Sequence, residues 1–183
     1  VFMNAYAAAP NCAPSRACLM SGQYTPRHGI YTVNNSDRGS AKHRKLIPIR
    51  NTIHLADEFV TLGESLQAAG YVTATIGKWH LGKDPTTQGF DFNVAGKQWG
   101  SPSGGGYHSP YKYPNLEQKN KGEYLTDRLG REACKFIEQC KDKPFFLYFT
   151  HYAVHTPIEA KEELIKKYQR KNCLLYTSPS PRD

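Results

Sequence analysis

The sequence predicts an α/β fold in which a mostly parallel sheet is flanked by helices. Two observations carry this prediction. Between residues 61 and 150, segments with helical periodicity alternate with β-rich runs, and polar side chains follow both runs. Such alternation is typical of parallel sheets, because parallel strands need long crossover connections that are usually helical. With 183 residues and 39% hydrophobic residues, the chain is long enough for one domain with a packed core.

The stretch NCAPSRACLMSG, which begins at Asn11, predicts a short helix with an unusual first turn. Asn11 is a residue type that caps helices, Pro14 suits the first turn, and Gly22 suits the end. Cys12 then lies at the positive end of the helix, with Arg16 one turn later. This setting favours a thiolate and attracts an oxyanion. A small buried cysteine beside a surface arginine would give the same local pattern.

Five further segments have the pattern of a strand or a helix. They are a strand at 1–9, a helix at 61–69, a strand at 71–76, a helix at 125–140 and a strand at 145–150. Thr61 and Glu64 have the spacing of a capping box, and apolar residues recur every three or four positions in the second helix. The run FFLYFT at 145–150 is continuously apolar, which predicts a strand buried on both faces.

Polar residues follow both predicted inner strands. Lys78 and His80 come after the first strand, and His151 and His155 come after the second. Ligands bind at the carboxyl edge of open α/β sheets, so these four side chains are candidates for one site. A single histidine at a strand end is more often structural, and His151 is left open between a substrate contact and a structural role.

Residues 84–123 have no sustained periodicity and are rich in Gly, Pro, Tyr and Asn. A loop this long is usually functional or disordered. Its aromatic side chains could stack on sugar rings or pack as an ordinary surface excursion, and the sequence leaves both readings open. These aromatic residues are Trp99, Tyr107, Tyr111 and Tyr113.

The net charge is +8, with basic runs at 41–45 and 166–171. A basic surface fits nucleic acid, an anionic polysaccharide or plain solubility, and charge alone does not choose among them. The five cysteines show no metal spacing, and no apolar run is long enough to span a membrane. Residues 1–172 are expected to be part of a catalytic domain, and 173–183, an abrupt compositional change, to be a non-native tail.

Three motifs resemble the type I sulfatases, which depend on formylglycine and include the arylsulfatase-A-like enzymes. CAPSR at 12–16 matches their C-x-P-S-R signature, GYVTATIGKWH at 70–80 their second signature, and PFFLYFTHYAVHTP at 144–157 their third block. The motifs occur in the family's order. The resemblance implies an alkaline-phosphatase-like fold and a sulfuric ester hydrolase, of which this chain is a fragment truncated at both ends and inactive by itself.

The resemblance also implies residue roles. Cys12 is oxidised to formylglycine, whose hydrated form, held at calcium, attacks the sulfur; loss of a proton from its second hydroxyl then expels sulfate. Arg16 orients this group, and Lys78 contacts it and the sulfate. His80 is the base for elimination, and His155 contacts the sulfate or protonates the leaving oxygen.

Calcium is expected from the resemblance, but only Cys12, as formylglycine, can be named as its ligand. The chain contains Asp37, Asp57, Asp84 and Asp91, but none of these four aspartates stands in a context that matches the family's calcium ligands. The implied partners are a sulfated small molecule or polysaccharide and the enzyme that oxidises Cys12, with no nucleic acid and no membrane span. The family's location is periplasmic, secreted or lysosomal, and no signal peptide is recognisable in the sequence.

Two rival functions stay open. A formylglycine-dependent phosphonate or phosphate monoester hydrolase would share the fold and the nucleophile, although the GKWH and HTP contexts favour a sulfatase. A basic module that binds glycan or nucleic acid without catalysis would have no need of Cys12, so substitution of that residue separates it from the enzymes.

Overall fold

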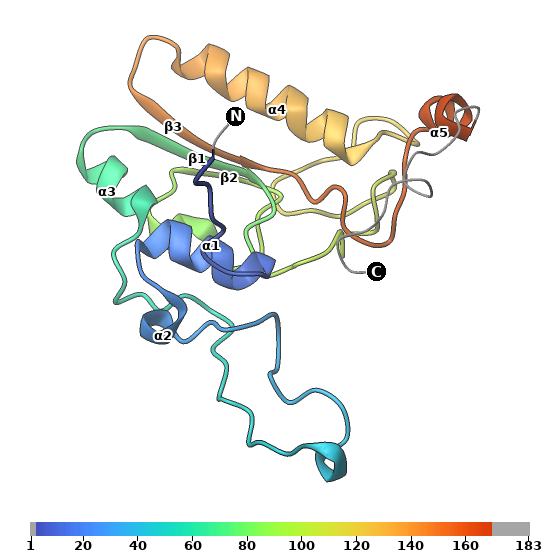
Figure 1. Cartoon of the computed structure of the whole chain (residues 1–183). Helices are drawn as coiled ribbons and strands as arrows, with labels where there is room; N and C mark the ends of the chain where they lie inside the picture. Colours follow the sequence, from blue (N-terminus) through green and yellow to red (C-terminus); the bar gives the residue numbers. More distant parts are fainter. Residues whose placement is uncertain (1–2, 170–183) are drawn as a thin grey trace.

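The computed structural model describes residues 3–169 and shows a three-stranded sheet with helices on both faces (Figure 1). The central strand β1 (Val72–Gly77) lies between β2 (Phe92–Val94) and β3 (Phe145–Thr150). Both pairings are parallel, with Ile76 of β1 level with Phe149 of β3. The predicted α/β class with a parallel sheet is confirmed.

The helices form one layer on each side of this sheet. Helix α4 (Leu125–Cys140) lies along one face, and α1 (Cys12–Ser21) and α3 (Leu62–Ala68) lie on the other (Figure 1). The remaining elements are α2 (Thr25–His28), α5 (Glu162–Gln169) and the 3₁₀ turns η1 (Ala41–His43) and η2 (Pro85–Gln88). No described helix is long and apolar enough to cross a membrane.

Each face of the sheet has its own hydrophobic core, because successive strand residues point to opposite faces. Ala74 and Ile76 of β1 pack with Leu129 and other apolar residues of α4. On the opposite face, Tyr148 of β3 packs with Ala17 of α1. The fold therefore holds the start of α1 against the carboxyl edge of the sheet.

The predicted cap of α3 is confirmed. Thr61 Oγ1 accepts a hydrogen bond from the Glu64 backbone N–H at 3.0 Å, and Glu64 Oε2 accepts one from the Thr61 N–H at 2.7 Å. This reciprocal pair satisfies two N–H groups that the first turn of a helix leaves free.

Two strand predictions need correction. Residues 3–9 form no strand, since they pair with none of the three strands, and an extended segment without a ladder partner is irregular backbone. Strand β3 exists at the predicted position, but it is not buried on both faces. Among the described residues it pairs only with β1, and Phe149 is 38% exposed.

The long segment 84–123 is part of the core. It contains β2 and η2, which the sequence did not predict because a three-residue strand is too short for a periodic pattern. Tyr107, Tyr111 and Tyr113 are 1%, 3% and 5% exposed and pack on the α4 side of the sheet. Packing is therefore the correct reading for these three tyrosines, and their buried rings cannot stack on a sugar. The predicted tail at 173–183 lies outside the described residues.

Candidate active site

Cys12 is the first residue of α1 and lies at a cavity of about 740 Å³. Asn11 is the N-cap residue as predicted, yet its side chain does not cap the helix: Asn11 Nδ2 donates to Thr32 Oγ1 at 3.2 Å. Gly22 ends the helix with φ 64°. The free N–H groups of the first turn are left beside Cys12, where they favour a negative group.

The segment after β1 brings two polar side chains to Cys12. Trp79 is fully buried and packs edge-on against Phe90, with ring centroids 5.5 Å apart. Its two neighbours, Lys78 and His80, are also buried, at 4% and 3% exposure. The buried indole thus anchors the turn that carries both polar residues.

His80 contacts the candidate nucleophile directly. Its Nδ1 lies 3.4 Å from Cys12 Sγ. Burial, followed by the nearby charges of Lys78 and Arg16, lowers the pKa of His80 to about 4. The imidazole is therefore neutral near pH 7, and a neutral imidazole can accept a proton from a group at position 12.

Lys78 supplies positive charge to the same point. Burial lowers the pKa of its ammonium, while the electrostatic interaction and the hydrogen bond with Cys12 oppose this shift. A buried ammonium next to a nucleophile attracts an anion strongly, because little water screens it. This is the chemistry needed where the negative charge of a bound ester increases during transfer.

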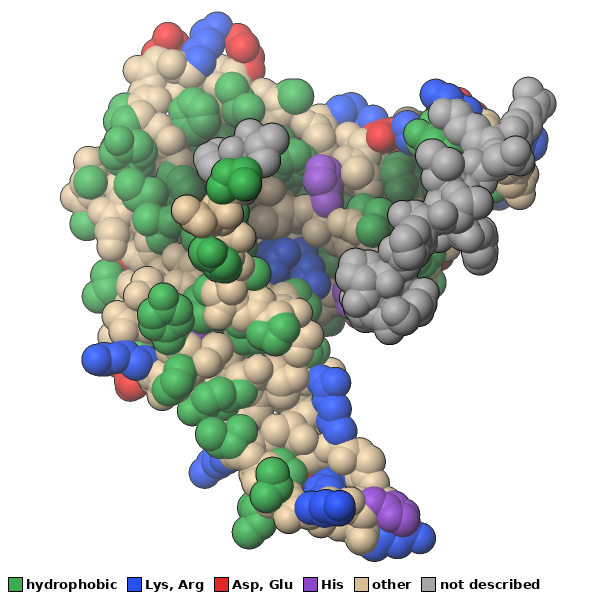
Figure 2. All heavy atoms as spheres, viewed as in Figure 1, with side chains coloured by type: hydrophobic (Ala, Val, Ile, Leu, Met, Phe, Trp, Pro, Cys, Tyr) green, Lys and Arg blue, Asp and Glu red, His purple; other side chains and the backbone are tan. Residues whose placement is uncertain are grey.

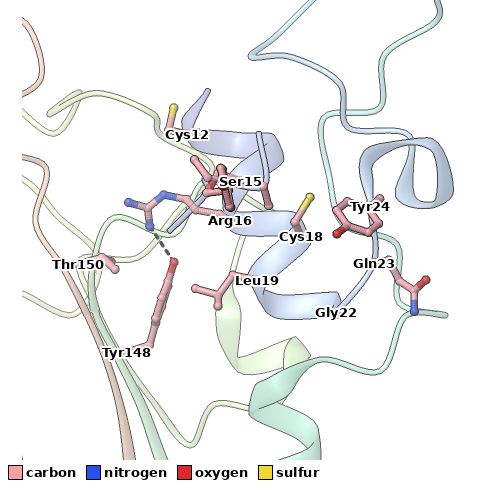
Figure 3. A pocket seen from close by; sticks show the side chains of 13 residues that line it. Cys12, Ser15, Arg16, Cys18, Leu19, Gly22, Gln23, Tyr24, Tyr148 and Thr150 are labelled. Carbon is pink, nitrogen blue, oxygen red and sulfur yellow. Dashed lines mark hydrogen bonds between the residues drawn. The ribbon is translucent and has the colours of Figure 1, made fainter. Parts of the chain in front are cut away.

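Arg16 joins α1 to the carboxyl edge of the sheet (Figure 3). Its Nη1 donates to the Lys78 backbone oxygen at 2.5 Å and to the Tyr148 hydroxyl at 3.2 Å. Thr150 Oγ1 donates to the same Lys78 oxygen at 2.7 Å. Both Tyr148 and Thr150 lie in the third motif at 144–157, but the sequence alone gave neither a role, because only the parallel register of β1 and β3 brings them here.

The other two candidates are less closely placed. His155 is exposed, and its Nδ1 donates to the Thr156 backbone oxygen at 2.9 Å, although its charge contributes to the lowered pKa of His80. His151 packs on Phe149, its Nδ1 has no hydrogen-bond partner among residues 3–169, and burial lowers its pKa. The structure brings Cys12 together with Arg16, Lys78 and His80. No hydrogen bond within residues 3–169 joins His151 or His155 to these four residues.

The described residues do not form a calcium site. Residues 3–169 contain no group of three or more His, Cys, Asp or Glu side chains that could hold a metal ion. The aspartates serve the fold instead: Asp91 accepts from the Thr73 N–H at 2.8 Å, Asp84 caps η2, and Asp37 pairs with Arg44. Calcium needs several hard oxygen ligands, mostly carboxylates, and this part of the chain does not bring three such groups together.

His80 has an uncommon backbone conformation, and a nearby glycine leaves room for its side chain. Its φ of +69° is uncommon for a residue with a side chain, and its N–H donates to the Lys97 oxygen at 2.9 Å. A Cβ on Gly100 would lie 2.3 Å from His80 Cε1. Gly100 therefore leaves the space that the imidazole occupies beside Cys12.

Replacing Gly100 with alanine should displace the His80 ring from Cys12. Because small misplacements of reacting groups are costly, kcat of the whole protein for the reaction at position 12 should fall by about 10- to 100-fold. Gly130→Ala in α4, where an added Cβ meets nothing, is the matched control and should keep wild-type kcat. In unmodified protein, the pH dependence of Cys12 alkylation should change for Gly100→Ala only. Unchanged kcat and alkylation in Gly100→Ala would contradict this placement of His80.

Comparisons with known proteins agree with one another. The sulfatase family model matches residues 1–175. The chain is 33% identical to human N-acetylgalactosamine-6-sulfatase over 93% of its length and 30% identical to rat arylsulfatase G over 89%. It is also similar to the crystal structure of Ps i-CgsB in complex with k-i-k-neocarrahexaose, with a TM-score of 0.64, 29% identity, and coverage of 91% of this chain and 40% of that chain.

The chain spans 35% of the human relative and 36% of the rat one. The matched part contains the turn at 78–80, the start of α1 and the sheet edge that joins them. With the family model matching nearly the whole chain, the protein belongs to the sulfatase family.

Proposed function

We propose that the whole protein hydrolyses sulfate esters of a carbohydrate, with formylglycine derived from Cys12 as the nucleophile. The observation that carries this proposal is the placement of Cys12 at a helix N-terminus, 3.4 Å from a neutral histidine and beside a buried lysine and Arg16. The site combines a reactive position with fixed positive charge, as transfer from an anionic ester requires.

Formylglycine in its hydrated form supplies one hydroxyl that attacks sulfur and a second whose deprotonation allows sulfate to leave. The chain's own residues prepare both events. Lys78 neutralises charge on the sulfate oxygens from a buried position. Arg16 uses one nitrogen to bind the Lys78 carbonyl and Tyr148, and its other N–H groups can bind the ester. His80 takes the proton, since its imidazole is neutral near pH 7.

Three further features belong to this proposal. We assign His155 to the leaving oxygen, which needs the exposed side chain to turn toward the site when substrate binds. Calcium would be held by carboxylates outside residues 3–169, with one oxygen from the modified Cys12. The partner that produces this modification is a formylglycine-generating enzyme, and the location is periplasmic, extracellular or lysosomal.

The sugar substrate is supported by the relatives rather than by the site. The human relative is named for a 6-sulfated N-acetylgalactosamine, and the structure of Ps i-CgsB is a complex with k-i-k-neocarrahexaose. Neither of these two relatives is named for a phosphate or phosphonate ester, so a sulfated sugar is the better supported substrate.

Co-expression of the whole protein with a formylglycine-generating enzyme should make the tryptic peptide that ends at Arg16 about 18 Da lighter than its cysteine form. The modified protein should hydrolyse 4-nitrophenyl sulfate, and 4-nitrophenyl phosphate should react far more slowly. Full sulfatase turnover by protein in which Cys12 is still an unmodified thiol would contradict formylglycine as the nucleophile. Faster hydrolysis of the phosphate than of the sulfate would replace the proposed function with the rival hydrolase.

A further inference from the structure

Residues 34–50 form an excursion, here called the basic arm, that projects from the body beyond α1 and α2 (Figure 1). Lys, Arg and His side chains gather on this projection, with hydrophobic side chains among them (Figure 2). The basic arm contains one carboxylate, Asp37, and five lysines or arginines: Arg38, Lys42, Arg44, Lys45 and Arg50.

Most of this charge is not neutralised within the described residues. Asp37 pairs only with Arg44, at 3.6 Å. Lys42, Lys45 and Arg50 are exposed and make no ion pair with any carboxylate of residues 3–169. By contrast, Lys166 in α5 pairs with Glu162 one turn away. The basic arm is therefore a concentrated positive surface rather than a balanced, solvated face.

Hydrogen bonds give the basic arm a defined shape. At its base, Asn51 Oδ1 accepts from the Tyr31 N–H at 2.7 Å and the Thr32 N–H at 3.1 Å, and Asn51 Nδ2 donates to the Thr32 oxygen at 3.1 Å. Toward its end, Arg44 Nη2 donates to the Gly39 oxygen at 2.9 Å. The cations are thus presented on an ordered scaffold, which lowers the entropy lost when a ligand binds.

We propose that the basic arm binds the anionic chain of a sulfated polysaccharide outside the Cys12 site. This proposal rests on the proposed function and extends it: a polymer held by the basic arm would stay bound while single esters are cleaved at Cys12. A linear polyanion with sulfates on successive sugars matches several exposed cations that no carboxylate of the described residues pairs with. The polymer would thereby gain affinity that a small sulfate ester lacks.

A membrane is the other anionic surface to consider, because Leu46 and Ile47 on the basic arm are 84% and 96% exposed. Segments that lie in a membrane interface are usually amphipathic helices with a basic face. The helical content of the basic arm is the three-residue turn η1. The observations therefore favour the polysaccharide.

The test compares two charge-reversal variants of the whole protein. One changes Lys42, Lys45 and Arg50 to glutamate, and the control changes three exposed lysines that make no ion pair within residues 3–169, Lys121, Lys135 and Lys143, to glutamate. Both variants alter net charge equally. Affinity for dextran sulfate, unsulfated dextran and phosphatidylserine vesicles is measured in about 0.15 M NaCl, where long-range attraction is screened. Circular dichroism checks that both variants fold.

The basic-arm variant should bind dextran sulfate about 10-fold or more weakly than wild type. Three ion pairs between the arm and the sulfate groups of the polymer are lost, and the new glutamates repel those sulfate groups. The control should stay within about 2-fold, and unsulfated dextran should not bind. Equal loss in both variants would overturn the proposal, as would arm-dependent binding to vesicles alone. Arm-dependent binding to dextran sulfate, with no sulfate ester hydrolysed by the whole protein, would overturn the proposed function and leave this inference standing.

Discussion

Changing Cys12 to serine should reduce steady-state turnover of aryl sulfate by the whole protein about 10³-fold or more. Serine cannot become an aldehyde, so it has no second hydroxyl through which sulfate is expelled. Its hydroxyl can still attack sulfur once, because Lys78 and Arg16 remain in place. We therefore expect a burst of at most one equivalent of released phenol, followed by accumulation of protein sulfated at position 12.

The burst separates this prediction from simple misfolding. A misfolded variant gives neither released phenol nor sulfated protein, whereas the predicted variant gives both, visible by absorbance and by mass spectrometry. Cys134→Ser, at an exposed position of α4, is the matched control and should keep wild-type turnover. Sustained turnover by Cys12→Ser at the wild-type rate would exclude formylglycine as the nucleophile.

Removing the charge of Lys78 should lower kcat/KM by about 10²-fold, the scale expected when an oxyanion loses a charged contact. Lys78→Ala removes both charge and packing, whereas Lys78→Met keeps an unbranched apolar stem at this buried position. Both variants should therefore lose activity to a similar extent. The fold should survive in Lys78→Met, because Arg16 and Thr150 bind the backbone oxygen of this residue rather than its side chain.

Lys83→Ala serves as the control for Lys78. Lys83 lies five residues later, is exposed and makes no ion pair within the described residues, so its loss should change kcat/KM less than about 2-fold. Binding of free sulfate gives a second measurement, and only the Lys78 variants should weaken it. Wild-type kinetics in Lys78→Met would remove the turn at 78–80 from the active site.

Much of the fold was predictable because its signals are local. The capping pair Thr61 and Glu64, the glycine that ends α1 and the apolar stripe of α4 depend on residues a few positions apart. The two strand predictions that were wrong concern how strands pair and what covers them. Residues 3–9 have strand-like composition but no partner among the described strands, and β3 is less buried than its apolar run suggested, since burial depends on what covers a strand.

In the candidate site, too, the features carried by neighbouring residues were predictable, and the contacts between distant segments were not. The motifs placed Cys12 and Arg16 on one helix turn and Lys78 and His80 in one loop, and the structure brings these four together. The roles assigned to them stay predictions, as does the role of His155. Nothing in the sequence pointed to Tyr148 as a partner of Arg16 or to Gly100 as the space beside His80.

The sequence by itself determined the chemical types at the site, because the residues of each motif are neighbours along the chain and their spacing is visible there. Only the tertiary structure decided that the imidazole of His80 is neutral, that the ammonium of Lys78 is buried and that Arg16 binds a carbonyl rather than water. The physical reason is that burial and register are set by contacts between distant segments. A helix at 12–21, a strand at 72–77 and a strand at 145–150 meet only when the sheet has formed, and the local dielectric and the hydrogen-bond partners follow from that meeting.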